Sequence, residues 1–127
     1  MKMKKVFNKL FAFALAATLI ISASTCSYAE SGQYGSFYLT YTCSVSATKG
    51  TATTSGATNP YYNCAIITVY KNGTSKGNAC GYKKQAKATA TKSGVGLTKA
   101  YSCHSVTDAN KKQLLSFNQQ KTLTKYR

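Results

Sequence analysis

Alternation of apolar and polar residues over residues 35–47 is the clearest pattern in the chain. Tyr38 and a series of hydroxyl-bearing residues occupy one side of this segment. The other side carries Phe37, Leu39, Tyr41, Cys43, Val45 and Ala47. Because successive side chains of a strand point to opposite faces, this two-residue period predicts a half-buried β-strand.

Residues 61–71, with the sequence YYNCAIITVYK, carry apolar side chains at both odd and even positions. Their β-branched and aromatic residues predict a central strand that ends in a turn at Asn72 and Gly73. The preceding residues 48–60 are rich in Thr, Ser and Gly and end at Pro60. This composition predicts a long turn or an irregular edge that contributes nothing to a core.

Residues 80–104 predict a hairpin that joins a basic face to a face of small residues. A strand over residues 80–91 would place alanines on one side and lysines and threonines on the other. The Ser-Gly-Val-Gly sequence at residues 93–96 would turn the chain back, so that its lysines share one region of surface. The expected anion-binding residues are Lys83, Lys84, Lys87, Lys92, Lys99, Tyr82 and Tyr101.

Residues 105–127 allow two interpretations. Asp108 could cap a short helix that runs to Gln120. Alternatively, the chain turns at residues 108–111 between strands over residues 104–107 and 113–118, which we favour because the rest of the chain predicts strands. The expected fold is therefore all-β: a small antiparallel β-sandwich of about five to seven strands, stabilised by two disulfides.

The amino terminus has the organisation of a secretory signal peptide. Four lysines precede the apolar run at residues 10–21, which is too short to span a bilayer. Small residues at Ser27 and Ala29 predict cleavage before Glu30, which leaves a single domain over residues 30–127 without a transmembrane segment. A competing interpretation makes Cys26 a lipidated anchor, although Ala23 and Thr25 depart from the usual bacterial pattern.

Charge narrows the class of partner. Four of the 17 basic residues precede residue 30, so thirteen remain against Glu30 and Asp108, a formal net charge of +11. Such a domain attracts polyanions, and the lysines offer point charges for phosphate. The plain alternative is a basic secreted protein whose charge only keeps it soluble or wall-associated. No motif predicts specific nucleic-acid binding.

Four cysteines follow residue 30, an even number in a chain expected to be exported. They predict two disulfides worth roughly 3 kcal/mol each, with the pairing left open. The cysteines are Cys43, Cys64, Cys80 and Cys103. A zinc site is the alternative, but no CxxC spacing supports a metal, and no cofactor is expected.

The residue types needed for common hydrolytic sites are scarce. A glycosidase needs two carboxylates in one cleft, whereas the only acidic residues are Glu30 and Asp108. His104 is the only histidine, which disfavours ribonuclease-like acid–base chemistry, and its ordinary interpretation is an exposed or hydrogen-bonded strand residue. A catalytic Ser/Lys dyad remains an alternative, because both residue types occur throughout the chain. We therefore expect a binding protein and not an enzyme.

Several segments give the mature chain a resemblance to the lactococcin 972 group of secreted bacteriocins. They are SGQYGSFYLTY after the signal, the alternating Ala86, Ala88 and Ala90, and KAYS at residues 99–102. The resemblance implies a small β-sandwich that acts on a wall precursor during septum formation. The absence of Trp and the four added cysteines depart from that group.

Two functions are expected from these observations. The first is a secreted cationic bacteriocin-like protein that binds an anionic envelope component, namely a wall precursor, teichoic acid or lipid headgroup. The second is a non-toxic structural or adhesion module of the cell wall. A secreted nuclease is a third and less supported hypothesis.

Overall fold

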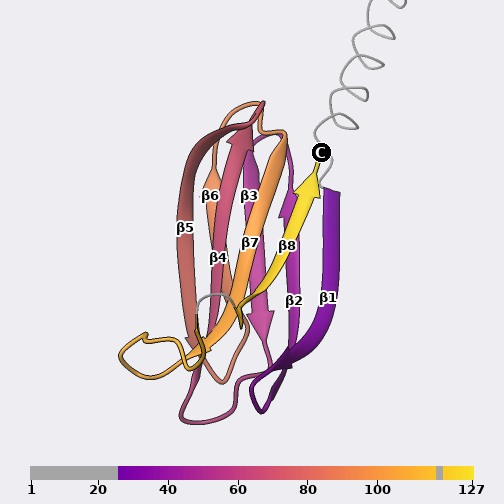
Figure 1. Cartoon of the computed structure of the whole chain (residues 1–127). Helices are drawn as coiled ribbons and strands as arrows, with labels where there is room; N and C mark the ends of the chain where they lie inside the picture. Colours follow the sequence, from indigo (N-terminus) through magenta and orange to yellow (C-terminus); the bar gives the residue numbers. More distant parts are fainter. Residues whose placement is uncertain (1–25, 117–118) are drawn as a thin grey trace, which may run out of the picture.

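Two four-stranded antiparallel sheets pack face to face in the computed structural model, which describes residues 26–116 and 119–127 (Figure 1). One sheet has the order β1-β2-β3-β6 and the other the order β5-β4-β7-β8. The all-β antiparallel prediction is confirmed, with eight strands instead of five to seven. They are β1 (Cys26–Tyr34), β2 (Phe37–Val45), β3 (Lys49–Ser55), β4 (Tyr62–Lys71), β5 (Thr74–Lys84), β6 (Ala88–Ser93), β7 (Lys99–Thr107) and β8 (Lys121–Tyr126).

The signal-peptide prediction falls almost entirely on residues 1–25, which lie outside the described residues. Its predicted boundary falls inside β1, because Cys26 already pairs with Val45 and Ala29 with Thr42. Cleavage before Glu30 would therefore leave the second half of β1 paired with β2. The boundary itself stays a prediction.

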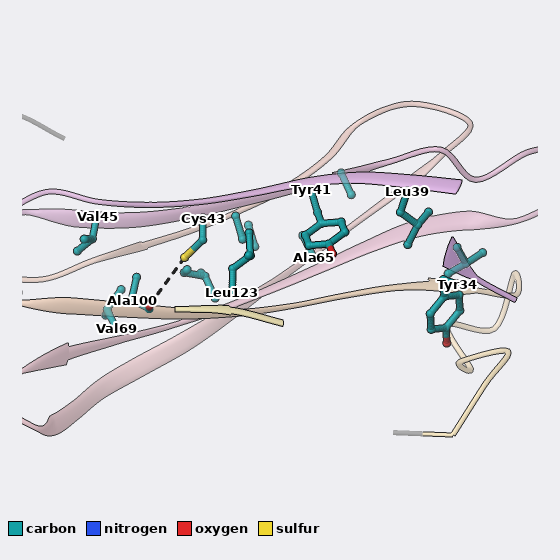
Figure 2. Close-up of a cluster of buried hydrophobic side chains, with 14 of the residues drawn as sticks. Tyr34, Leu39, Tyr41, Cys43, Val45, Ala65, Val69, Ala100 and Leu123 are labelled. Atoms are coloured by element: carbon teal, nitrogen blue, oxygen red, sulfur yellow. Dashed lines mark hydrogen bonds between the residues drawn. The ribbon is translucent and has the colours of Figure 1, made fainter. Parts of the chain in front are cut away.

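The core lies between the sheets, and β2 supplies one of its walls (Figure 2). Leu39, Cys43 and Val45 are fully buried, whereas Tyr38 is 63% exposed, which confirms the predicted alternation over residues 37–45. It does not extend to residue 47, because Ser46 is buried and Ala47 is only partly buried. The predicted central strand is also confirmed, since β4 lies between β5 and β7. Its inward-facing side chains are Asn63, Ala65, Ile67 and Val69.

The prediction of an irregular segment over residues 48–60 is wrong in its first half. Residues 49–55 form β3, which lies in the interior of the first sheet between β2 and β6. Its inward positions are small because the opposite sheet is close: a Cβ on Gly50 would lie 2.5 Å from Cγ1 of Val69. Ala52 and Thr54 are fully buried beside it.

The predicted continuous strand over residues 80–91 is interrupted. Gln85 has a φ of +57°, in the left-handed region, and it ends the run of strand after Lys84. The chain then crosses from β5 in the second sheet to β6 in the first. Ala88 and Ala90 are buried as predicted, but Ala86 is exposed. The Ser-Gly-Val-Gly segment is likewise a crossover to β7 and not a hairpin turn.

The carboxyl-terminal segment follows the β interpretation. Asp108 begins a turn in which its Oδ1 accepts hydrogen bonds from the backbone N–H groups of Asn110 and Lys112. A single bridge joins Thr107 to Gln113, and the regular partner of β7 is β8. The turn is as predicted, whereas the returning strand begins at Lys121 and not at Gln113.

Candidate functional site

The outer face of the second sheet gathers some of the predicted anion-binding residues. Register pairs Tyr82 with Cys64 and Tyr101 with Thr68, opposite to the core-facing side of β4. Lys84 and Lys99 point outward on the same face by the same register. The outward-facing tyrosines of this sheet are Tyr62, Tyr70, Tyr82, Tyr101 and Tyr126.

The structure does not bring the predicted lysines into one region. Lys84 pairs with Tyr62 and Lys99 pairs with Tyr70, at positions eight residues apart along β4. At the rise of an extended strand this separation is about 27 Å. The prediction of a single shared surface is therefore wrong, because the crossover at Gln85 sends β5 and β6 into different sheets.

Lys83, Lys84 and Lys87 lie around the connection from β5 to β6, at the lower end of the sandwich in Figure 1. Lys111 lies near them, with its Nζ 5.2 Å from the centroid of the Tyr82 ring. The lysines at this end are not free of acidic neighbours, because the turn that carries Lys111 also carries the carboxylate of Asp108.

Lys92 and Lys99 lie at the opposite end, where β2, β4, β6 and β8 finish and β1, β3, β5 and β7 begin. We call this region the basic end; it is the upper end in Figure 1. It carries no Asp or Glu side chain, because Glu30 lies within β1 opposite Tyr41 and Asp108 lies at the other end. Its cationic residues are Lys49, Lys71, Lys76, Lys92, Lys99, Lys125 and Arg127.

Aromatic rings hold one cation of the basic end in place. The Nζ of Lys99 lies 4.2 Å from the centroid of the Tyr70 ring and 5.8 Å from that of Tyr126. Cation–π contacts at partly exposed sites contribute about 0.5–1 kcal/mol each. Lys99 is therefore positioned between two rings at the surface and keeps its charge available to an anion.

Five cations of the basic end were missed by sequence reasoning: Lys49, Lys71, Lys76, Lys125 and Arg127. The sequence did place Lys71 at the end of a strand, because this residue precedes the predicted turn at Asn72 and Gly73. The sequence does not show the strand order. Only the topology shows that one end of each of the eight strands and the loop of residues 94–98 lie at the same end of the sandwich.

The basic end carries six separate ammonium groups and one guanidinium, which are spread over several strands. The described cavity, of about 120 Å³, lies at the opposite end and has no charged side chain in its lining of Tyr34, Gly35, Ser36, Phe37, Leu114 and Leu115. Lysine charges spread over several strands suit an extended anionic surface better than one bound phosphate.

The predicted pair of disulfides is not formed: all five cysteines of residues 26–127 are free thiols. Cys43 faces the core and its thiol donates to the carbonyl of Ala100, with 3.8 Å between Sγ and O. Cys64, Cys80 and Cys103 lie on the outer face of the second sheet. Because Cys43 lies on the inner face of the first sheet and the other three lie on the outer face of the second, the two disulfides predicted among these four cysteines cannot both form in this fold. Burial raises the pKa of the Cys43, Cys64 and Cys103 thiols.

We expect one fast-reacting thiol in the folded protein when it is produced as residues 30–127. Cys80 is exposed, whereas Cys43, Cys64 and Cys103 are buried, and only an accessible thiolate reacts readily. Reaction of the buried thiols requires local opening, so it should be roughly 100-fold slower or more. Titration with an aromatic disulfide reagent measures both phases. Cys80→Ser should remove the fast phase alone, and a native protein without any reactive thiol would contradict this assignment.

His104 is fully buried and hydrogen-bonded through both ring nitrogens. Its Nδ1 lies 2.7 Å from the Thr54 hydroxyl, and its Nε2 lies 2.7 Å from the Ser102 hydroxyl. Ser102 also donates to the carbonyl of Leu123, so its oxygen accepts from Nε2–H while Nδ1 accepts from Thr54. Burial lowers the pKa of His104 to about 4. The Ser102–His104 pair therefore has no access to a substrate in this fold.

Within residues 26–116 and 119–127, no group of three or more His, Cys, Asp or Glu side chains is arranged to hold a metal ion. The same residues include no helix that is both long and apolar enough to cross a bilayer.

Comparison of the chain with protein-family models, curated proteins and solved structures finds no match. The resemblance to the lactococcin 972 group thus stays an expectation.

Proposed function

We propose that this protein is secreted and binds an anionic component of the bacterial cell envelope, as a bacteriocin-like effector. One observation carries the proposal: seven cations meet at the basic end without an Asp or Glu side chain among them. Charges of one sign on a small domain attract an extended polyanion and speed the encounter with it. We favour binding over hydrolysis because His104, the histidine that acid–base chemistry would use, is fully buried in the core.

The second candidate is a non-toxic wall-associated structural or adhesion module, which a different surface favours. The outer face of the first sheet is rich in hydroxyl groups, with Lys49 at one end, and Thr42 and Thr53 are hydrogen-bonded across its strands. Such a face suits contact with polysaccharide hydroxyls. Its members include Ser31, Thr40, Thr42, Ser44, Thr51, Thr53, Ser55, Thr89 and Thr91.

The two functions separate in one experiment with the purified secreted protein. We expect it to bind isolated bacterial envelopes at low salt and to lose most of that binding at about 0.5 M salt, where surface charges are screened. Growth inhibition of related bacteria, measured with and without teichoic acid or wall precursor as competitor, then distinguishes effector from adhesion module. Inhibition relieved by one competitor supports the effector, binding without inhibition supports the adhesion module, and absence of low-salt binding contradicts both.

A further inference from the structure

The basic end also carries the two most exposed large hydrophobic side chains among the described residues. Val95 is 81% exposed and Tyr126 is 67% exposed. Val95 stands at the tip of the loop over residues 94–98, between Gly94 and Gly96. An isolated exposed apolar residue is ordinary, but the loop of Val95 lies beside the cationic side chains of Lys71 and Arg127.

The loop that presents Val95 is fixed at both of its ends. The backbone N–H of Gly94 donates to the carbonyl of Thr48 at 2.9 Å, and that of Thr98 donates to the carbonyl of Tyr70 at 2.8 Å. Leu97 is fully buried and its N–H donates to the carbonyl of Ala47 at 3.0 Å. Because Leu97 anchors the loop in the core, Val95 is held outward and cannot fold back to cover itself.

Cations flank this tip at close range. The Cε of Lys71 lies 3.3 Å from the position that a Cβ on Gly96 would take. The guanidinium-bearing Arg127 donates from its Nε to the carbonyl of Leu97 at 2.9 Å. On the other side, Lys99 lies against the rings of Tyr70 and Tyr126. The exposed Val95, the two tyrosines and these cations therefore lie on one surface of the basic end.

We propose that the basic end docks on an anionic lipid bilayer, with Val95 entering the interfacial layer and Tyr126 lying at the level of the headgroups. A dissolved polyanion would use the lysines but would leave Val95 in water, whereas a bilayer accepts both at once. Tyrosine is suited to the same depth, because its ring is apolar and its hydroxyl is polar. This inference rests on the proposed function, since it takes lipid as the anionic envelope component.

The first test uses vesicles of phosphatidylglycerol and phosphatidylcholine in equal parts, with pure phosphatidylcholine vesicles as the neutral probe. We expect sedimentation with the anionic vesicles only. Replacing Lys49, Lys71 and Lys76 by Gln should lower the partition coefficient about 100-fold, at about a fivefold loss for each lysine near the surface. The matched control replaces Lys83, Lys84 and Lys87, which are equally exposed but lie at the other end, and should lose less than about fivefold.

The second test measures how deeply residue 95 enters the bilayer. The chain contains no Trp, so Val95→Trp introduces a single tryptophan, which can be excited without its tyrosines and whose emission should shift to the blue on anionic vesicles. Val95→Asp should lower partition about tenfold. Circular dichroism of every variant confirms that the fold is retained.

The outcomes distinguish this inference from the function on which it rests. Equal losses in the two triple variants, or bound Val95→Trp without a blue shift, would overturn docking through the basic end. Failure to bind anionic vesicles combined with binding to teichoic acid would overturn the lipid inference and leave the proposed function standing. Failure to bind either would overturn both.

Discussion

Acidification from pH 6.5 to pH 4 is expected to remove about 3 kcal/mol from the free energy of unfolding, because the buried His104 resists protonation. Burial lowers the pKa of this imidazole from an ordinary 6.5 to about 4. The unfolded chain therefore binds a proton in this pH range that the folded protein does not. Stability from His104 is complete above pH 6.5 and is lost as the pH falls through the range down to about 4.

The packing around His104 explains why the proton is excluded. The Tyr41 ring lies against the imidazole with 4.8 Å between centroids, and no carboxylate contacts it. A backbone hydrogen bond to Thr53 favours the protonated ring, but the burial outweighs it. Protonation would place a second N–H against Thr54, whose hydroxyl would have to reverse and stop donating.

Urea unfolding at several pH values between 4 and 7 measures this effect. His104→Gln should flatten the pH dependence in that window, since it removes the titrating group. The histidine resonance of the unsubstituted protein provides a test that needs no variant, because His104 is the only histidine in the chain. A folded-state resonance that titrates near pH 6.5 would contradict the burial of this side chain.

The parts of the fold that were predictable are those in which one face of a strand is uniformly apolar. Alternation in β2 identified Leu39 and Val45 as core residues, and both are fully buried. The same rule failed for β3, where Gly50 and Ala52 face the core although neither is a strong apolar signal. Small inward residues are needed there because the opposite sheet packs closely, and close packing is a property of the whole fold.

The residue types of the candidate site were predictable, but their place was not. Composition predicted a polyanion partner, which stays a prediction, and Lys92 and Lys99 were both named. Lys71 and Arg127 join them only because β4 and β8 end beside the start of β7. Equally, an even cysteine count predicted disulfides, although the alternation in β2 already placed Cys43 on the apolar face. What the sequence does not show is that Cys64, Cys80 and Cys103 lie on the outer face of the other sheet.

The close contact between β5 and β6, which lie in different sheets, leads to the second large expected effect. Gly81 of β5 lies against the backbone of β6: a Cβ at this position would lie 2.6 Å from the carbonyl carbon of Thr89 and would overlap its oxygen. Its nearest obstacles are backbone atoms, which cannot move aside as a side chain does. Gly81→Ala should therefore separate the two strands and cost about 3 kcal/mol, the upper part of the range for overpacked sites.

A matched control comes from Gly32 in the edge strand β1. A Cβ there would meet only the Tyr41 hydroxyl at 3.4 Å and the Cε of Lys121 at 3.5 Å, both ends of flexible side chains. Gly32→Ala should change the free energy of unfolding by no more than about 0.5 kcal/mol. For both variants, the shift of the urea unfolding midpoint measures the change in stability, provided that the dependence of the unfolding free energy on urea is unchanged. Equal midpoints for Gly81→Ala and the unsubstituted protein would show that β5 and β6 do not close this side of the sandwich, because no other arrangement accommodates the added methyl group without cost.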